Sequence, residues 1–459
     1  MDSGQLYDAV IVGGGLAGTT VAAELALLGP RHLRVLLVEA AEPGPGRAYA
    51  PASERVYMNG TARAMSAVAG DKQHLVRWLR TEPEQSLIPR RVYGRYLTDR
   101  FHEAVAGRSG FEVARTEIVD IFSQDDAFTV VDARGGERSA RNVVLALGNF
   151  LPDYSFLPEP LYRHPGFVAD PWRFNPGTGF ADNMHGEIAI VGSGLTALDA
   201  VALLDEQGFS GRLHLVSRHG LLPCIENPFA HALDLDALAL DTQTPYALLR
   251  SLRAAARRHC EAGGDWRDVV ESIRSISPDV WSAWSLRERR RFLRHVQPFW
   301  AIHRYRVPPQ TAAVCSRLRR EGRLVRHRGR IDEASETADG RLRVRIVHAT
   351  GITSLVVSGA INCTGPNGDY TRVRHPLVQN LLRRGIIRPD VLSLGMDATT
   401  DLRVIDREGR RNERLFTLGP PLRGLRYETT AVPETREQAA LVARWIVEAL
   451  PEQRLEAAS

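Results

Sequence analysis

The fold is decided near the start of the chain, where residues 9–18 read Ala-Val-Ile-Val-Gly-Gly-Gly-Leu-Ala-Gly. The apolar residues 9–12 predict a buried strand, and the alanine-rich stretch that follows, as far as Leu28, predicts a helix. A second apolar run, residues 35–38, ends on Glu39. This β-loop-α-β order predicts the opening of a doubly wound parallel sheet.

The glycine loop has the spacing G-x-G-x-x-G that dinucleotide-binding turns require. The first glycine makes the tight turn, the second lets a pyrophosphate approach the backbone, and the third lets helix and strand pack closely. An acid at the end of the second strand can accept hydrogen bonds from both ribose hydroxyls. The residues predicted to bind this dinucleotide are Gly13, Gly14, Gly15, Gly18 and Glu39.

The same order returns later in the chain, where the apolar residues 188–191 precede a second glycine loop. Its predicted binding residues are Gly192, Ser193, Gly194, Ala197 and Arg218. Here the second strand ends on Arg218 rather than on an acid. An arginine at this place suits a 2′-phosphate and favours NADPH, but an arginine that only stacks on the adenine would leave NADH equally acceptable.

Two dinucleotide folds in one chain predict an α/β protein with two doubly wound, Rossmann-like domains, the second inserted in the first. Buried strands that end in glycine, at 143–148 and 359–365, suggest where the chain crosses between the domains. We therefore expect a discontinuous FAD domain at 1–180 and 350–459 and an NAD(P)H domain at 181–349. Residues 221–310 exceed what the second domain needs and predict a helical insertion, either a lid or a substrate-facing element.

Two further segments predict which loop takes the flavin. A long irregular excursion follows the first loop, and a flavin needs such a segment along its ring and ribityl chain; a plain surface loop is the alternative. Near the other end, a helix predicted over 434–450 could direct its positive N-terminus at the flavin N1/O2 edge, unless it is only a packing helix capped by Thr430. The predicted FAD contacts in these segments are Arg47, Tyr49, Asn59, Met65, Ser66, Gly419, Thr430, Ala431 and Val432.

An arginine-rich segment, residues 285–309, predicts a helix with one apolar face, on Phe292, Val296, Phe299 and His303, interrupted at Pro298. The opposite face, with Arg287, Arg290, Arg291 and Arg294, can be read as a solvated surface. The alternative is a site for a planar or anionic substrate, because arginine makes bidentate contacts and Trp300 can stack. On that reading the candidate catalytic residues are Arg294, His303 and Arg304.

Composition excludes several classes of protein. The net charge is only +5 over 459 residues, which does not favour nucleic acid as a partner. Four scattered cysteines without a CxxC argue against a disulfide framework or a zinc ribbon and fit the cytoplasm. No metal site and no membrane span is expected, and the oligomeric state is left open. No residues suited to nucleophilic catalysis are apparent, so the chemistry is assigned to the flavin.

The chain resembles bacterial two-dinucleotide FAD/NAD(P)-binding flavoprotein monooxygenases. The resemblance rests on the Gly-x-Ala-Tyr segment followed by Asn59 and Met65-Ser66, and on three longer motifs, at 90–97, 303–309 and 428–439. One departure is Pro420, which follows Gly419 where many flavoproteins carry an aspartate.

The resemblance implies that NAD(P)H reduces FAD and that a flavin C4a-(hydro)peroxide, formed with O2, oxidises a small molecule. It favours hydroxylation of urate to 5-hydroxyisourate, in purine metabolism, because the chain is compact. The alternative within the group is N-hydroxylation of an amino-acid amine such as aspartate. A flavin reductase or electron carrier without oxygen insertion, and a non-catalytic nucleotide sensor, are readings from other classes.

Overall fold

The computed structural model describes residues 6–50, 53–80, 82–124, 127–172 and 186–450. Its largest element is an eight-stranded sheet built around a parallel core in the order β16-β6-β1-β2-β3. An antiparallel strand, β15, extends one edge, and the β4-β5 hairpin joins β6 antiparallel. The strands are β1 (Leu6–Val12), β2 (Val35–Val38), β3 (Phe111–Ala114), β4 (Ile118–Gln124), β5 (Ala127–Asp132), β6 (Glu137–Leu145), β15 (Arg403–Ile405) and β16 (Arg411–Thr417).

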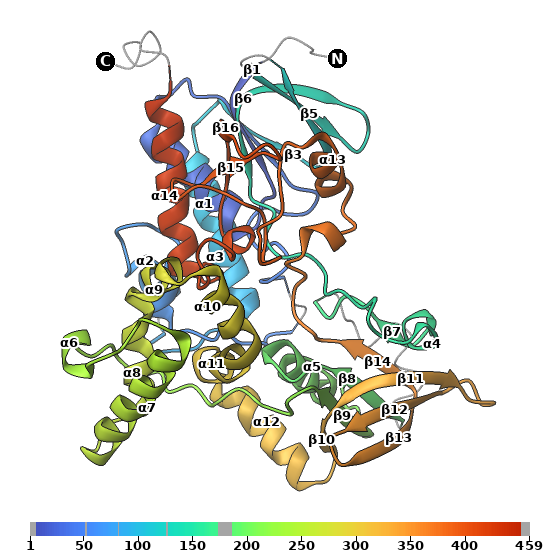
Figure 1. Ribbon diagram of the computed structural model, residues 1–459. Helices are drawn as coiled ribbons and strands as arrows, with labels where there is room; N and C mark the ends of the chain where they lie inside the picture. Colours follow the sequence, from blue (N-terminus) through green and yellow to red (C-terminus); the bar gives the residue numbers. More distant parts are fainter. Residues whose placement is uncertain (1–5, 51–52, 81, 125–126, 173–185, 451–459) are drawn as a thin grey trace.

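Helices cover both faces of this sheet. One face packs on three long helices, α1 (Leu16–Leu28), α3 (Arg90–Val105) and α14 (Val432–Glu448), which lie side by side in Figure 1. The other face packs against the β4-β5 hairpin and α13 (Pro376–Arg384). Burial on both faces explains why residues 9–12 of β1 and the whole of β2 are continuous apolar runs rather than alternating ones.

A second, five-stranded sheet is parallel throughout, in the order β10-β9-β8-β14-β7. Two helices, α5 (Leu195–Glu206) and α12 (Pro309–Arg320), pack on one face. The other face packs against α4 (Glu159–Arg163) and a three-stranded antiparallel sheet. The strands of these two sheets are β7 (Phe167–Val168), β8 (Glu187–Val191), β9 (Arg212–Ser217), β10 (Leu324–Arg328), β14 (Gly359–Asn362), β11 (Arg330–Glu336), β12 (Leu342–His348) and β13 (Gly351–Val357).

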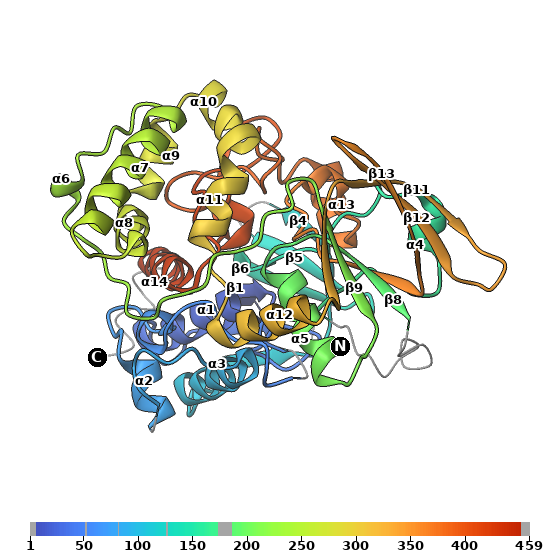
Figure 2. The same cartoon turned by 90° about the horizontal axis from the view of Figure 1, so that it is seen from below.

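The remaining helices form a separate group with its own core. They are α6 (Leu235–Leu238), α7 (Pro245–Glu261), α8 (Trp266–Ser272), α9 (Ser277–Ala283), α10 (Leu286–Arg291) and α11 (Gln297–Arg304), while the short α2 (His74–Leu79) lies beside α3. In Figure 2, α14 lies between this group and α1. The helical insertion expected at 221–310 therefore packs near the N-terminus of the last helix.

Several expectations need correction in detail. The last helix begins at Val432, two residues earlier than expected, and ends at Glu448. The predicted apolar face at 292–303 is wrong at Phe299, which is 47% exposed. The interruption there is a π-helical turn, Phe292–Val296, after which α11 begins with Pro298 in its first turn. A proline fits that place because the first N–H groups of a helix have no partner in the helix.

The two sheets do not follow the predicted domain boundaries closely. The predicted boundaries place both β7 and β14 in the first domain. In the structure both belong to the second sheet, where β14 pairs with β7 on one side and with β8 on the other. The predicted boundary at 180/181 lies outside the described residues. The apolar runs at 143–148 and 359–365, which end in glycine, predict where the chain crosses between domains. In the structure they contain the end of β6 and the whole of β14, which are the last strands before the chain moves from one sheet to the other.

Candidate functional site

The first glycine loop contains glycines of two kinds. Gly13 has a φ of +101°, and a Cβ there would lie 2.5 Å from the carbonyl oxygen of Ala146; a Cβ at Gly18 would lie 1.8 Å from that of Gly13. These two glycines are required by the turn itself. Gly15 has an ordinary φ of −75°, and a Cβ there would meet only the Cα of Gly46, at 3.4 Å. The fold alone therefore does not require glycine at position 15. A ligand that must approach the backbone closely at this position would require it.

Glu39 lies beside this loop. Its Oε2 accepts a hydrogen bond from the Gly14 N–H at 2.8 Å, and its Oε1 accepts one from the Ala41 N–H at 3.1 Å. Two backbone donors thus fix the carboxylate at the carboxyl end of β2. Each oxygen keeps further lone pairs, so the residue fits the ribose-binding role predicted for it.

The excursion after β2 contacts the same loop. The Gly44 N–H donates to the Gly14 carbonyl at 2.7 Å, and Gly46 lies so close to Gly15 that a Cβ on Gly46 would be 2.8 Å from the Gly15 Cα. Arg47 pairs with Asp170 at 3.0 Å. Tyr49 packs edge-on against the buried ring of Tyr93, and burial raises the pKa of Tyr49 to about 12. The excursion is thereby held over the N-terminus of α1, as a cofactor-covering segment would be.

The rest of this predicted flavin segment is tied to the last helix. Met65 and Ser66 are buried, and Asn59 is half-buried. Ser66 Oγ donates to the Asp71 carbonyl at 2.6 Å, so the hydrogen of this hydroxyl is already bonded within the protein. The carbonyl of Ser66 accepts from Arg436 of α14 at 2.9 Å.

The N-terminus of α14 has no side-chain cap. The position before Val432 is Ala431, which cannot accept a hydrogen bond through its side chain, and Thr430 is exposed; Thr430 is therefore not the helix cap. The turn is held instead by Gln438, which accepts from the Gly419 N–H at 2.7 Å and donates to Thr429 at 2.7 Å. The first N–H groups of α14 are free to meet a ligand with negative charge, such as the pyrimidine edge of a reduced flavin.

The second glycine loop repeats the distinction. Gly192 has a φ of +123°, and a Cβ there would lie 2.2 Å from the Cys363 carbonyl oxygen. A Cβ at Gly194, whose φ is −81°, would meet nothing within 4 Å. Open space at this position is what a pyrophosphate would fill. The third position accepts Ala197, whose methyl group is buried under the helix.

Arg218 follows the carboxyl end of β9, as predicted. Its side chain is exposed and forms no hydrogen bond or ion pair with the described residues. The loop beneath it is fixed by Ser193, which donates to Ser217 Oγ at 2.7 Å and lies 2.6 Å from the Leu221 carbonyl. A second exposed arginine, Arg328, is paired in register with Ser217. The end of this sheet therefore presents two guanidinium groups where an adenosine 2′-phosphate would lie.

A cavity of about 550 Å³ lies inside the helical group, closed on one side by Tyr427 and Glu428 of the segment that leads into α14. This volume is within the usual range for small-molecule sites, about 300–1,000 Å³. The aromatic residues on its wall are Trp266, Trp281, Trp284, Phe292, Phe299, Trp300 and Tyr427. The cavity reaches within a few residues of the uncapped helix N-terminus, so it is the candidate substrate site.

The three predicted catalytic residues fall in different places. Arg294 is exposed and does not line the cavity, so the interpretation of its helix face as solvated applies to it. His303 lines the cavity, with Nδ1 bonded to the Phe299 carbonyl at 2.8 Å. Arg304 lies behind the wall, where its Nε is 3.2 Å from Glu428 Oε2. Burial disfavours the charged form of Arg304, yet the carboxylates of Glu428 and Glu271 raise its pKa above the ordinary value.

Sequence reasoning missed Glu428. Its Oε1 accepts from the Trp300 indole N–H at 2.8 Å, and its Oε2 accepts from the Tyr305 hydroxyl at 3.4 Å. The residue opens the motif at 428–439, one of the motifs that carry the resemblance. The only feature of the neighbouring sequence that could have pointed to Glu428 is its position just before the turn into α14.

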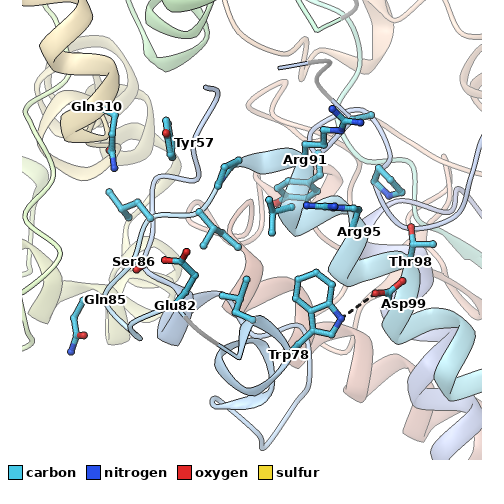
Figure 3. Close-up of a pocket in the computed structure, with 18 of the residues that line it drawn as sticks. Tyr57, Trp78, Glu82, Gln85, Ser86, Arg91, Arg95, Thr98, Asp99 and Gln310 are labelled. Atoms are coloured by element: carbon cyan, nitrogen blue, oxygen red, sulfur yellow. Dashed lines mark hydrogen bonds between the residues drawn. The ribbon is translucent and has the colours of Figure 1, made fainter. Parts of the chain in front are cut away.

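A larger groove, of about 1,330 Å³, lies on the outer side of α3 (Figure 3). Arg91 and Arg95 project into it from one face of α3, and Trp78 donates to Asp99 at 3.2 Å. Gln310 of α12 lies across the groove from them. None of the glycines of the two loops lines this groove, so its size does not make it the cofactor site.

The described residues contain no group of three or more histidine, cysteine, aspartate or glutamate side chains placed to hold a metal ion. Across the same residues, no helix combines the length and the apolar character that crossing a membrane requires.

Comparison with known proteins agrees with this geometry. Residues 10–150 match a protein-family model described as FAD-NAD(P)-binding, in agreement with the predicted cofactors. No curated protein sequence matches the chain. The α/β fold with a parallel dinucleotide-binding sheet, predicted from the two glycine loops, is confirmed.

Solved structures share the fold at low sequence identity. An ornithine N-hydroxylase from Kutzneria sp. 744, determined with reduced FAD, NADP+ and L-ornithine, is 15% identical, with a TM-score of 0.63 over 97% of this chain and 99% of the other. L-lysine 6-monooxygenase from Pseudomonas syringae is 17% identical, with a TM-score of 0.63 over 97% and 100%. Thioredoxin reductase from Lactococcus lactis is 16% identical, with a TM-score of 0.53 over 97% and 100%. Oxygenases and reductases thus share this architecture, and the choice between them depends on the site.

Proposed function

We propose that the chain is a FAD-dependent monooxygenase that uses NAD(P)H and O2. The observation that carries this proposal is the cavity that ends at Glu428, three residues before the N-cap of α14, where the flavin ring is expected. An enzyme that inserts oxygen must hold its substrate beside the flavin and away from water. A carrier that passes electrons to a dissolved acceptor has no need of such a chamber.

The cysteines support the choice against a disulfide reductase. All four are free, and Cys363 and Cys315 are buried, with pKa values that burial raises above the ordinary range. A dithiol centre needs two neighbouring thiols, at least one of them readily ionised. The sequence has no CxxC pair, and burial raises the pKa of Cys224, Cys315 and Cys363.

The residues have distinct roles in this proposal. The open side of Gly15 and the carboxylate of Glu39 would hold the FAD pyrophosphate and ribose, and the N–H groups of α14 would face the flavin ring. The open side of Gly194 would hold the NAD(P)H pyrophosphate, with Arg218 at its 2′-phosphate. When bound, FAD takes a hydride from NAD(P)H and activates O2, which no side chain of this site can do.

Oxygenation of an amine nitrogen is favoured over hydroxylation of urate. Ornithine and lysine hydroxylases are among the proteins with the same fold. The urate prediction rested on the compactness of the chain, and the planar anion was expected to suit arginines near Trp300. However, Arg294 and Arg304 do not line the cavity. In the favoured reaction an amine, O2, NADPH and a proton give the hydroxylamine, NADP+ and water.

The test is to purify the yellow holoprotein and measure NADPH or NADH oxidation together with O2 uptake. Candidate amines and urate are added separately, and the product is identified by mass. We expect a hydroxylamine 16 mass units heavier than its amine. Loss of urate absorbance coupled to NADPH oxidation would reverse the choice of substrate. Cofactor oxidation that only a quinone accelerates, with no oxygenated product, would reject a monooxygenase.

A further inference from the structure

We infer that the cavity binds its ligand in an uncharged form, as a hydrophobic molecule with an aromatic or branched body, and that it takes an amine as the free base. The inference rests on the proposed function for its claim that this ligand is the substrate. Its claim about charge comes from the wall of the cavity alone.

The body of the ligand follows from the wall. Aromatic rings alternate with aliphatic side chains such as Leu248, Val270 and Val280, which come from three different helices. Only five lining residues carry polar side-chain groups capable of recognising a ligand: Arg253, Ser277, His295, His303 and Glu428, the indole and phenol groups aside. A polar planar ligand such as urate would leave most of its N–H and C=O groups without partners there, and each such group costs free energy.

The one carboxylate in the wall is already neutralised. Glu428 is 3% exposed and is held by the Arg304 guanidinium, the Trp300 indole N–H and the Tyr305 hydroxyl. A buried acid that is paired in this way has little attraction left for a second cation. An ammonium group entering the cavity would therefore lose its hydration without gaining a counter-ion.

Guanidinium groups also occupy faces of three of the aromatic rings. Arg423 stacks on Tyr427 at 4.8 Å, Arg289 on Trp281 at 5.4 Å, and Arg267 on Trp266 at 4.5 Å. Arg289 and Arg423 form no ion pair with the described residues, whereas Arg267 pairs with Asp265 at 3.1 Å. Aromatic walls often recognise cations through their ring faces, but here a guanidinium already occupies one face of each of these rings. The three rings therefore attract a cationic ligand less than free rings would.

The interior of the cavity does not offer a positively charged partner to an anionic ligand either. The only guanidinium on the lining, that of Arg253, is exposed at the rim, together with His295. A carboxylate deeper in the cavity would lie among rings and aliphatic groups, with no guanidinium group to pair it. A neutral ligand is what remains, and for an amine the apolar surroundings lower its pKa and favour the free base. The free base carries the lone pair that N-oxygenation requires.

The test measures binding to the FAD-containing protein by equilibrium dialysis, without NADPH. Three probes share one body: 3-phenylpropan-1-ol is neutral, (3-phenylpropyl)trimethylammonium is a permanent cation, and 3-phenylpropionate is an anion. We expect the alcohol to bind at least tenfold more tightly than either ion. Equal or tighter binding of the cation would overturn the inference, and so would a failure of the alcohol to bind.

Variants locate the binding. Ala256→Leu and Leu249→Phe both place bulk in the cavity from α7, and either should weaken binding of the alcohol at least tenfold. Ala254→Leu lies on the exposed side of the same helix and should leave binding unchanged. Unchanged binding in both filling variants, with normal FAD content, would place the ligand elsewhere and reject the inference.

The outcomes for binding and for catalysis are separable. If hydrophobic amines bind as predicted but no oxygenated product forms, the proposed function fails and the charge of the ligand stands. If the protein oxygenates a permanently charged substrate, it is a monooxygenase but the inference is wrong.

Discussion

The Arg90 guanidinium lies 3.4 Å from the carboxylate of Asp199, and this ion pair joins α3 of the first sheet's layer to α5 of the second. Both side chains are largely buried, at 12% and 8% exposed. Arg90 also donates to the Tyr57 carbonyl at 3.3 Å and stacks on Trp172 at 5.1 Å. Because α5 begins at the second glycine loop, this contact helps to fix the distance between the two predicted nucleotide sites.

The Arg90–Asp199 pair gives a prediction for pH. Burial raises the pKa of Asp199 to about 6, against the opposing effect of the Arg90 charge. Between pH 4 and 6 the folded protein therefore binds a proton that the unfolded chain has lost, so ionising Asp199 lowers stability as the pH rises through 6. The Tm of Asp199→Asn minus that of the wild type should become more positive from pH 4.5 to pH 7. A difference that stays constant, measured by calorimetry, would show that this carboxyl does not titrate there.

Substitutions at the two open glycines should separate the two cofactors. Gly15→Val should yield a folded but colourless protein, because the side chain fills the space for the FAD pyrophosphate. Gly194→Val should keep full flavin and lose at least 100-fold in the rate of flavin reduction by NADPH. Absorbance at 450 nm and stopped-flow reduction measure both effects, and each variant is the control for the other. Full flavin in the first, or normal reduction in the second, would contradict the division of labour.

Arg218 should decide between the two nicotinamide cofactors. Arg218→Ala should raise the KM for NADPH about ten- to hundredfold, because a charge-assisted hydrogen bond to the 2′-phosphate is lost. The KM for NADH should hardly change. Arg212→Ala removes a similar charge at the other end of β9 and serves as the control. If Arg218→Ala affects both cofactors equally, the residue stacks on adenine and does not read the phosphate.

Glu428 should be required for stability as well as for the wall of the cavity. Glu428→Gln leaves the buried Arg304 without its nearest carboxylate and should destabilise the protein by about 3 kcal/mol. Glu288→Gln removes the partner of Arg291, whose side chain is 52% exposed, and should cost less than about 1 kcal/mol. Urea unfolding of the two variants provides the comparison. Similar losses in both would mean that Arg304 finds compensation from Glu271.

The glycine loops could be predicted from the sequence because their geometry is local. Strand β2 and the order of elements around Gly13 and Gly192 follow from steric requirements within a few residues. The cavity could not be predicted in this way. Trp300 and Glu428 are 128 positions apart, and no periodic pattern in the sequence predicts that their side chains are in contact. The arginine-rich helix shows the same limit, because its spacing does not tell which face meets solvent until its neighbours are known.

The closing of the cavity by Tyr427 and Glu428 has a consequence for synthesis. The helices that form the rest of the wall lie between residues 245 and 304, and the Trp281 indole N–H donates to the Gly424 carbonyl at 2.8 Å. A ribosome makes these helices well before it makes the residues that seal them. The nascent chain must therefore carry an open, hydrophobic-walled hollow through more than a hundred further residues of translation, which is the period when it most needs protection from aggregation.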